Sequence, residues 1–302
     1  MSNMGDMGDM GDMGDRMASI GAVAGAPVLP FRVDLPYGKE QPWLLSKQGA
    51  NWSWQSDPAA PDIESLPLVP GVNWGTRDWS IRWSAWLIVA EFSQAPWQQI
   101  RIRTWADFQR DAGITDADEI KALLIAAQDE RADALGEIQA QNTTYEDVMA
   151  YFMSLMRITS GSHPKTCRLM HIAGLVGLLA AMYFKANPAP GLSPRPRPSQ
   201  VCPALLPPIE VPGHPAFPSG HAVQSMLMAL SVEHALPVRL RAVMKPMLHT
   251  LAGRVARNRE IAGLHYHTDS LGGFELAGKA FELLLTGARF RAALDDATQE
   301  WC

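Results

Sequence analysis

Two short blocks in the C-terminal third of the chain combine residue types that can bind an oxyanion and act on it. The first is Pro218-Ser219-Gly220-His221, and the second places Arg259 before His265 and Asp269 in the spacing Arg-x5-His-x3-Asp. A serine hydroxyl, the N–H groups of a first helical turn and an arginine fork all attract phosphate-like oxygens. A carboxylate that holds one imidazole nitrogen leaves the other free as nucleophile or ligand. The blocks predict a pocket for a phosphate or a phosphate-like metal oxide.

Each block alone also has a purely structural interpretation. Ser219, Gly220 and His221 could form an ordinary turn and helix N-cap, although a glycine there also lets a ligand approach the backbone closely. Asp269 could cap the helix that follows it, and this role is compatible with orienting His265. The joint occurrence of both blocks favours the oxyanion pocket.

The blocks resemble the signature of the superfamily of type-2 phosphatidic acid phosphatases and vanadium-dependent haloperoxidases. That signature reads Lys-x6-Arg-Pro, Pro-Ser-Gly-His and Ser-Arg-x5-His-x3-Asp, and the resemblance covers about residues 166–285. It implies an α-helical bundle. Two departures stand out: Asn258 replaces the serine, and nine or eleven residues rather than six separate Lys185 from Arg195 or Arg197. The extra residues, 187–194, are proline-rich and can bulge out.

We choose Arg197 as the site arginine, because the family often shows Arg-x-Arg-Pro with the second arginine in the site, while Arg195 remains an alternative. Lys185 could instead be a helix-end lysine whose stem covers apolar surface. The resemblance implies one role for each matching residue. Lys185, Arg197 and Arg259 would neutralise the oxyanion, and Ser219 and the Gly220 N–H would bind further oxygens. His221 would be the general acid/base, and Asp269 would orient His265, which is the nucleophile in a phosphatase or the vanadium ligand in a haloperoxidase.

Both activities would use one pocket, because vanadate mimics the transition state of phosphoryl transfer. We favour a vanadium-dependent haloperoxidase that oxidises bromide or iodide with hydrogen peroxide, with vanadate as cofactor. His214, seven residues before His221, resembles a second histidine of the bromide-using members. The sequence around Asn258-Arg259 and the tryptophan-rich front also resemble haloperoxidases. Phe217 is expected to form a wall of the halide or substrate pocket, or to be a structural aromatic.

The alternative is a soluble acid phosphatase that hydrolyses phosphomonoesters through a phosphohistidine and needs no cofactor. A second alternative is a non-enzymatic binding protein. Eight of the ten tryptophans lie between residues 43 and 97 and could form a surface that binds a partner. An arm that packs on its own core, or on a second subunit of a homo-oligomer, explains these tryptophans more simply.

The length, charge and cysteine content of the chain narrow the classes of function and the cellular compartments that remain. The 302-residue chain has a net charge of −5, and residues 1–16 contribute −3 of it, so no basic stripe indicates nucleic acid. Three cysteines are too few for a disulfide framework or a zinc site. The acidic Met-Gly-Asp repeat is unlike a signal peptide, so we expect a soluble protein, cytoplasmic rather than secreted. The longest apolar run, residues 169–184, is short for a membrane span of ~20 residues and predicts a buried helix.

The pattern of the chain predicts three parts. Residues 1–16 form a disordered low-complexity tail, 17–76 an irregular Trp/Pro-rich arm without strand alternation, and 77–302 a helical catalytic domain whose core motifs span 185–269. Eleven of the 23 prolines lie between 188 and 218 and predict a long shaped loop. The fold class is all-α, a helical bundle with its loops forming the site at one end.

Periodicity and capping signals predict where the helices of this domain lie. Trp79, Trp83, Trp86 and Ala90 share one face of the first. Thr115 with Asp118, and Thr143 with Glu146, are capping boxes. The predicted helices are one starting near 78, one at 115–138, one starting after 143, and further ones at 166–185, 222–236, 238–258 and from 269 onward.

Overall fold

The computed structural model describes residues 43–48, 51–56 and 80–301, and the chain divides between Arg77 and Asp78 into two units. In the first unit, β1 (Trp43–Gln48) and β2 (Asn51–Ser56) form an antiparallel hairpin. The expectation that residues 17–76 contain no strand was therefore wrong at this hairpin. The Asn-Trp-Ser-Trp-Gln-Ser sequence of β2 alternates with a two-residue period, which is the period of a strand and not of a helix. The predicted tail, 1–16, lies outside the described residues.

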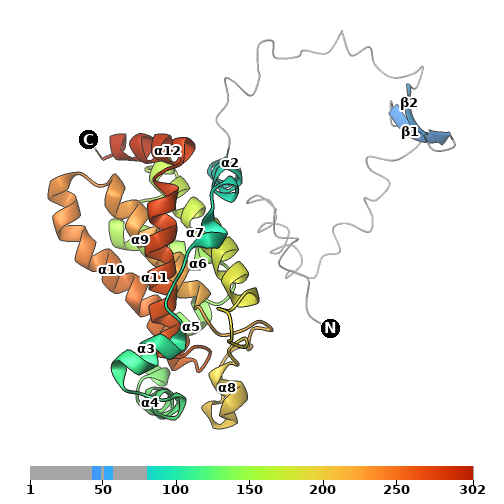
Figure 1. Ribbon diagram of the computed structural model, residues 1–302. Helices are drawn as coiled ribbons and strands as arrows, with labels where there is room; N and C mark the ends of the chain where they lie inside the picture. Colours follow the sequence, from blue (N-terminus) through green and yellow to red (C-terminus); the bar gives the residue numbers. More distant parts are fainter. Residues whose placement is uncertain (1–42, 49–50, 57–79, 302) are drawn as a thin grey trace. The chain divides into compact units, whose positions relative to one another are not determined.

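Residues 80–301 contain only helices and connecting segments, which confirms the all-α class for this part of the second unit (Figure 1). Their bounds are α2 (Ile81–Gln94), η3 (Trp97–Gln99), α3 (Trp105–Ala112), α4 (Asp116–Asp129), α5 (Arg131–Ala140), α6 (Tyr145–Met156), α7 (Pro164–Ala186), α8 (Pro198–Val201), η4 (Pro203–Leu205), α9 (Gly220–Ala235), α10 (Val238–Ile261), α11 (His267–Leu284) and α12 (Ala288–Gln299).

Helix α9 is the centre of this helical unit, because α7, α10 and α11 all pack against it. Its residues are buried around most of the helix, as expected for an element surrounded by others. Figure 1 shows α3, α4 and α8 gathered at one end of the helical unit, with α12 at the other. The proline-rich segment that includes α8 therefore lies at the end where α9 begins.

The predicted buried helix is α7, which is long and apolar enough to cross a membrane by length and composition. In this structure 67% of its most apolar 18-residue window is buried inside the fold. Leu178 and Met182 are the exposed large apolar side chains of this helix. Such burial against α2, α9 and α12 is typical of a core helix.

Several boundaries differ from the prediction. The helix expected at 115–138 is two helices, α4 and α5, which meet at Glu130. Thr115 does form a capping box with Asp118, but the next box uses Thr144 and Asp147, one residue later than predicted. The helix expected from 269 begins at His267 and is followed by α12.

The buried face of α2 is also not the one that its tryptophans share. Ala85, Ile88 and Phe92 are buried, whereas Trp86 is 43% exposed. Helix α2 therefore packs on α7 through aliphatic side chains and a phenylalanine rather than through Trp86.

Candidate oxyanion site

The two sequence blocks meet where α9 and α11 begin side by side. The backbone N–H of Ser219 donates to the carbonyl of Asp269 at 3.0 Å, and Ser219 is the N-cap of α9. A Cβ at Gly273 would lie 2.8 Å from both Ser219 O and the Cβ of Ala222. Only glycine therefore lets the two helices approach this closely without a shift. This contact joins Ser219 to the segment that carries His265 and Asp269.

The spacing between Arg259 and His265 follows from the end of α10. Gly263 has φ +76°, a left-handed conformation that glycine adopts without strain, and the N–H of Leu264 bonds back to Arg259 O at 3.0 Å. The chain then becomes extended at Tyr266 and enters α11. The six-residue spacing is thus one helix end, one left-handed turn and one extended step.

His265 is held at both ring nitrogens. Its Nδ1 lies 3.2 Å from Oδ2 of Asp269, and its Nε2 lies 2.9 Å from Nη1 of Arg197. A guanidinium only donates, so Nε2 accepts and Nδ1 carries the proton that Asp269 receives. Burial, followed by the charges of Arg197 and Lys185, holds the pKa of His265 well below its usual range. His265 is therefore a neutral imidazole with its lone pair on Nε2.

Asp269 is fully buried and serves three donors. Its Oδ2 accepts from the N–H of Tyr266 at 2.9 Å and from His265, and its Oδ1 accepts from Arg195 at 2.7 Å. Burial raises the pKa of Asp269, and the charge of Arg195 opposes that rise. The carboxyl group occupies the third position of α11 rather than the N-cap that the sequence allowed, and it still caps the helix start through Tyr266.

Arg195 and Arg197 have separate surroundings. Arg197 donates to the carbonyls of His214 and Leu264 as well as to His265. Arg195 does not contact His265, and its guanidinium lies over the ring of Tyr266, 3.7 Å from the centroid. The acceptors of Arg195 are three carboxylates and a hydroxyl, those of Asp116, Glu119, Asp269 and Thr268. Of the two arginines, the chosen Arg197 is the one that reaches the imidazole.

Within residues 80–301, the buried cations Lys185, Arg197 and Arg259 have no carboxylate partner of their own. Lys185 is 2% exposed and donates to the carbonyls of Pro215 and Ala216 at 2.6 and 2.9 Å, so it is not a solvated helix-end lysine. Arg259 is 1% exposed, and its Nη2 donates to a single carbonyl, that of Ile138, at 2.7 Å. Its Nε and Nη1 are buried and have no acceptor within residues 80–301.

Burial sets the proton affinities of these cations. It lowers the pKa of Arg197 and of Arg259 to about 10. It also lowers the pKa of Lys185 well below its usual value, and the nearby charge of Arg197 adds to the effect. A bound anion would reverse these shifts, since an opposite charge favours the charged form of each group.

Gly220 and His221 occupy the first positions of α9. A Cβ at Gly220 would meet only the Cβ of Ala181, at 3.9 Å, so the described residues leave space beside this backbone. Nε2 of His221 donates to the carbonyl of Gln141 at 2.8 Å, which leaves Nδ1 unprotonated in the neutral ring. Burial, then the charge of Arg259, lowers the pKa of His221 to about 3.

His214 contacts the site through Arg197. Its Nδ1 lies 2.9 Å from Nη2 of Arg197 and accepts from it. Burial, then Lys185 and Arg197, lowers the pKa of His214 to about 4. The histidine that the sequence singled out therefore borders the cation that touches His265.

Some supporting residues carried no sequence signal. Glu119 accepts from the N–H of Thr268 at 2.9 Å and from Arg195 at 2.8 Å, and so links α4 to the start of α11. Gln141, whose carbonyl holds His221, also receives a hydrogen bond at 3.0 Å from Asn258. Asn258 thus holds the side chain of the residue whose backbone carbonyl binds His221.

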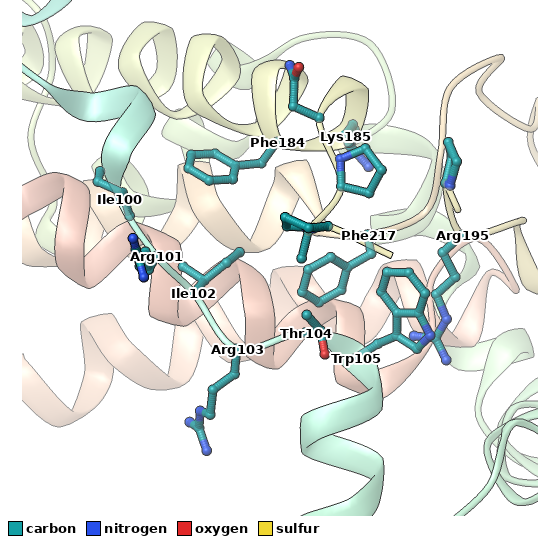
Figure 2. Close-up of a pocket in the computed structure, with 15 residues that line it drawn as sticks. Ile100, Arg101, Ile102, Arg103, Thr104, Trp105, Phe184, Lys185, Arg195 and Phe217 are labelled. Atoms are coloured by element: carbon teal, nitrogen blue, oxygen red, sulfur yellow. The ribbon is translucent and has the colours of Figure 1, made fainter. Parts of the chain in front are cut away.

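A cavity of about 420 Å³ borders this cluster at Lys185, Arg195 and Phe217 (Figure 2). His265, Arg197 and Ser219 are not among its lining residues, so the cavity is adjacent to the cluster rather than its centre. Phe217 packs against Trp105 with 5.4 Å between ring centroids and forms part of the cavity wall.

Comparison of the chain with protein-family models and with curated proteins gives no match. Within the described residues, Arg197 contacts Nε2 of His265, and Lys185, His214 and His221 lie near enough to lower the pKa of His265. Arg259 in turn lies near enough to His221 to lower the pKa of that histidine.

Proposed function

We propose that this protein is an enzyme whose buried cations bind a phosphate-like oxyanion against Nε2 of His265. The observation that carries the proposal is Arg259, which is buried with two N–H-bearing nitrogens that have no acceptor among the described residues. An unsatisfied buried donor costs about 1–3 kcal/mol, and a buried charge without compensation costs more. An oxyanion would remove both costs at once.

The oxyanion that we propose is vanadate, and the reaction is the oxidation of bromide or iodide by hydrogen peroxide. The donor set fits this group, because Lys185, Arg197 and Arg259 are cations and Nε2 of His265 is an unprotonated ligand. Ser219 and the N–H of Gly220 would hold further oxygens. When bound, vanadate supplies Lewis-acid activation of hydrogen peroxide toward attack by the halide.

The residues of this chain would manage orientation and protons. Asp269 keeps the proton of His265 on Nδ1 and so keeps Nε2 directed at the oxyanion. His221 has Nε2 tied to the carbonyl of Gln141, so its Nδ1 is the atom that would take a proton from peroxide and return it. The resemblance of His214 to a second histidine of the bromide-using haloperoxidases favours this reaction over phosphoester hydrolysis, and His214 is hydrogen-bonded to Arg197.

A phosphatase is the second candidate, and the cavity beside Lys185 favours it, because that cavity could receive an organic leaving group. In this reaction the charge of the bound phosphomonoester raises the pKa of His221, so that Nδ1 takes up a proton. Nε2 of His265 attacks phosphorus and forms a phosphohistidine as the ester P–O bond breaks, and Nδ1 of His221 gives that proton to the departing alkoxide. Water then hydrolyses the phosphohistidine with His221 as general base.

One assay compares the two activities directly. Protein freed of bound anions is assayed for bromide and iodide oxidation by hydrogen peroxide, with and without orthovanadate, and for hydrolysis of p-nitrophenyl phosphate. We expect halide oxidation that depends on orthovanadate and disappears in His265→Ala. His267→Gln, which changes a histidine paired with Glu260 outside the cluster, should retain it. Hydrolysis of p-nitrophenyl phosphate that is inhibited by vanadate, without halide oxidation, would establish the phosphatase instead.

A further inference from the structure

The cavity beside Lys185 lies between three segments of the chain. One is the stretch 100–104 that joins η3 to α3, together with Trp105 at the start of α3. Another is the C-terminal end of α7, and the third is 187–194. Its volume of about 420 Å³ falls in the range of about 300–1,000 Å³ that small-molecule sites occupy. The residues that stretch the first sequence block are therefore one wall of a ligand-sized cavity.

The inner surface of the cavity is mainly apolar and aromatic. Ile102, Phe184 and Phe217 all line it, and Figure 2 shows Trp105 beside Phe217. Pro188, Pro190 and Pro194 also line the cavity. Flat rings and prolines lose little conformational entropy on binding, so such a surface suits an aromatic or branched apolar group.

Every charged residue that lines the cavity is a cation, namely Arg101, Arg103, Lys185 and Arg195. Arg103 is paired with Glu275 at 2.9 Å, and Arg195 with the carboxylates described above. The side chain of Arg101 is exposed and has no ion pair or hydrogen bond within residues 80–301. Lys185 is buried and donates to the carbonyls of Pro215 and Ala216, so Arg101 is the exposed cation of this lining that has no acceptor within residues 80–301.

We propose that this cavity binds a small organic anion that has an aromatic or branched apolar body. Its anionic group pairs with Arg101 at the exposed edge, and its body lies against Phe184 and Phe217 beside Lys185. The inference rests on the proposed function only for the role of the compound, which would be the organic acceptor of the oxidised halogen or the leaving group of a phosphoester.

Binding can be measured apart from catalysis with a matched pair of probes, naphthalene-2-sulfonate and the neutral naphthalene-2-methanol, by isothermal titration. We expect the wild-type protein to bind both and to prefer the sulfonate. Arg101→Ala should weaken sulfonate binding about three- to fivefold, as for one exposed ion pair, and leave the neutral probe unchanged. Arg289→Ala, at another exposed arginine, is the control and should change neither.

A second variant tests the cavity itself. Ala189→Trp places a bulky side chain at an exposed loop position of the wall, where folding should tolerate it, and should weaken both probes at least about tenfold. Undiminished binding in this variant, or no binding by the wild-type protein, would overturn the proposal. An equal loss of both probes in Arg101→Ala would overturn the anion assignment. Probe binding that persists in His265→Ala supports the proposal. If the wild-type protein binds the probes but shows neither halide oxidation nor phosphatase activity, the proposed function fails and the cavity proposal stands.

Discussion

Nη1 of Arg197 donates to Nε2 of His265 at 2.9 Å, and this is the nitrogen that an oxyanion would have to reach. The arginine thus occupies the lone pair of the imidazole. On binding, Arg197 would transfer its hydrogen bond from the ring to an oxygen of the ligand, while Asp269 keeps the other side of the ring fixed. One side chain would then protect the nucleophile or ligand atom in the free protein and neutralise charge in the complex.

The first prediction concerns the proton affinity of His265. Arg197→Gln removes a positive charge beside the ring, so the pKa of His265 should rise, although burial keeps it below the ordinary value. A ¹⁵N NMR titration of the imidazole nitrogens measures this and also reports the predicted Nδ1–H tautomer. Arg289→Gln should leave the titration unchanged. A wild-type spectrum with the proton on Nε2 would contradict the hydrogen-bond assignment.

The second prediction separates Arg195 from Arg197. Arg195→Leu leaves the buried carboxylates of Glu119 and Asp269 without their cation, which should lower the free energy of unfolding by about 3–5 kcal/mol. Urea denaturation with a shared slope measures the change. A decrease in the free energy of unfolding below about 1 kcal/mol would mean that the ion pairs of Arg195 with Glu119 and Asp269 do not hold Asp269 in place.

The third prediction compares two glycines of α11. Gly273→Ala should destabilise the protein by about 1–3 kcal/mol, because its Cβ would lie 2.8 Å from Ser219 O, and it should also weaken oxyanion binding by displacing Ser219. At Gly278, a Cβ would meet nothing within 4 Å, so Gly278→Ala should stabilise the helix by about 0.5–1 kcal/mol. Thermal unfolding measures the stability of both variants, and vanadate titration measures their oxyanion binding. Similar effects of the two substitutions would refute the close approach of α9 and α11.

The sequence predicted the parts of this site that depend on local spacing. The His265–Asp269 pair and the cap at Thr115 depend on residues only three or four positions apart. The choice between Arg195 and Arg197 could only be made by resemblance, because the stretched block gives no geometric rule. Glu119 could not be found, since it meets Arg195 from 76 residues away and a buried glutamate looks like any helical glutamate in sequence.

The fourth prediction is a pH dependence of stability. Burial lowers the pKa of His171 to about 4, against about 6.5 in an unfolded chain. Below pH 6.5 the unfolded state binds a proton that the folded state does not, so stability should fall as the pH drops from 6.5 toward 4. His171→Phe should remove up to about 1.4 kcal/mol per pH unit of this slope. Urea unfolding at several pH values tests it, and parallel curves for both proteins would count against a buried neutral His171.

The most direct test of the account is the affinity of the anion-free protein for orthovanadate, measured by isothermal titration with the wild type and with Arg259→Met. Methionine keeps much of the buried volume and removes the donors that have no acceptor. We predict binding of one vanadate per chain, weakened about 10- to 100-fold in the variant, as for loss of hydrogen bonds to a charged group. Absence of binding by the wild type, or equal affinity in the two proteins, would contradict an oxyanion site built around Arg259 and His265.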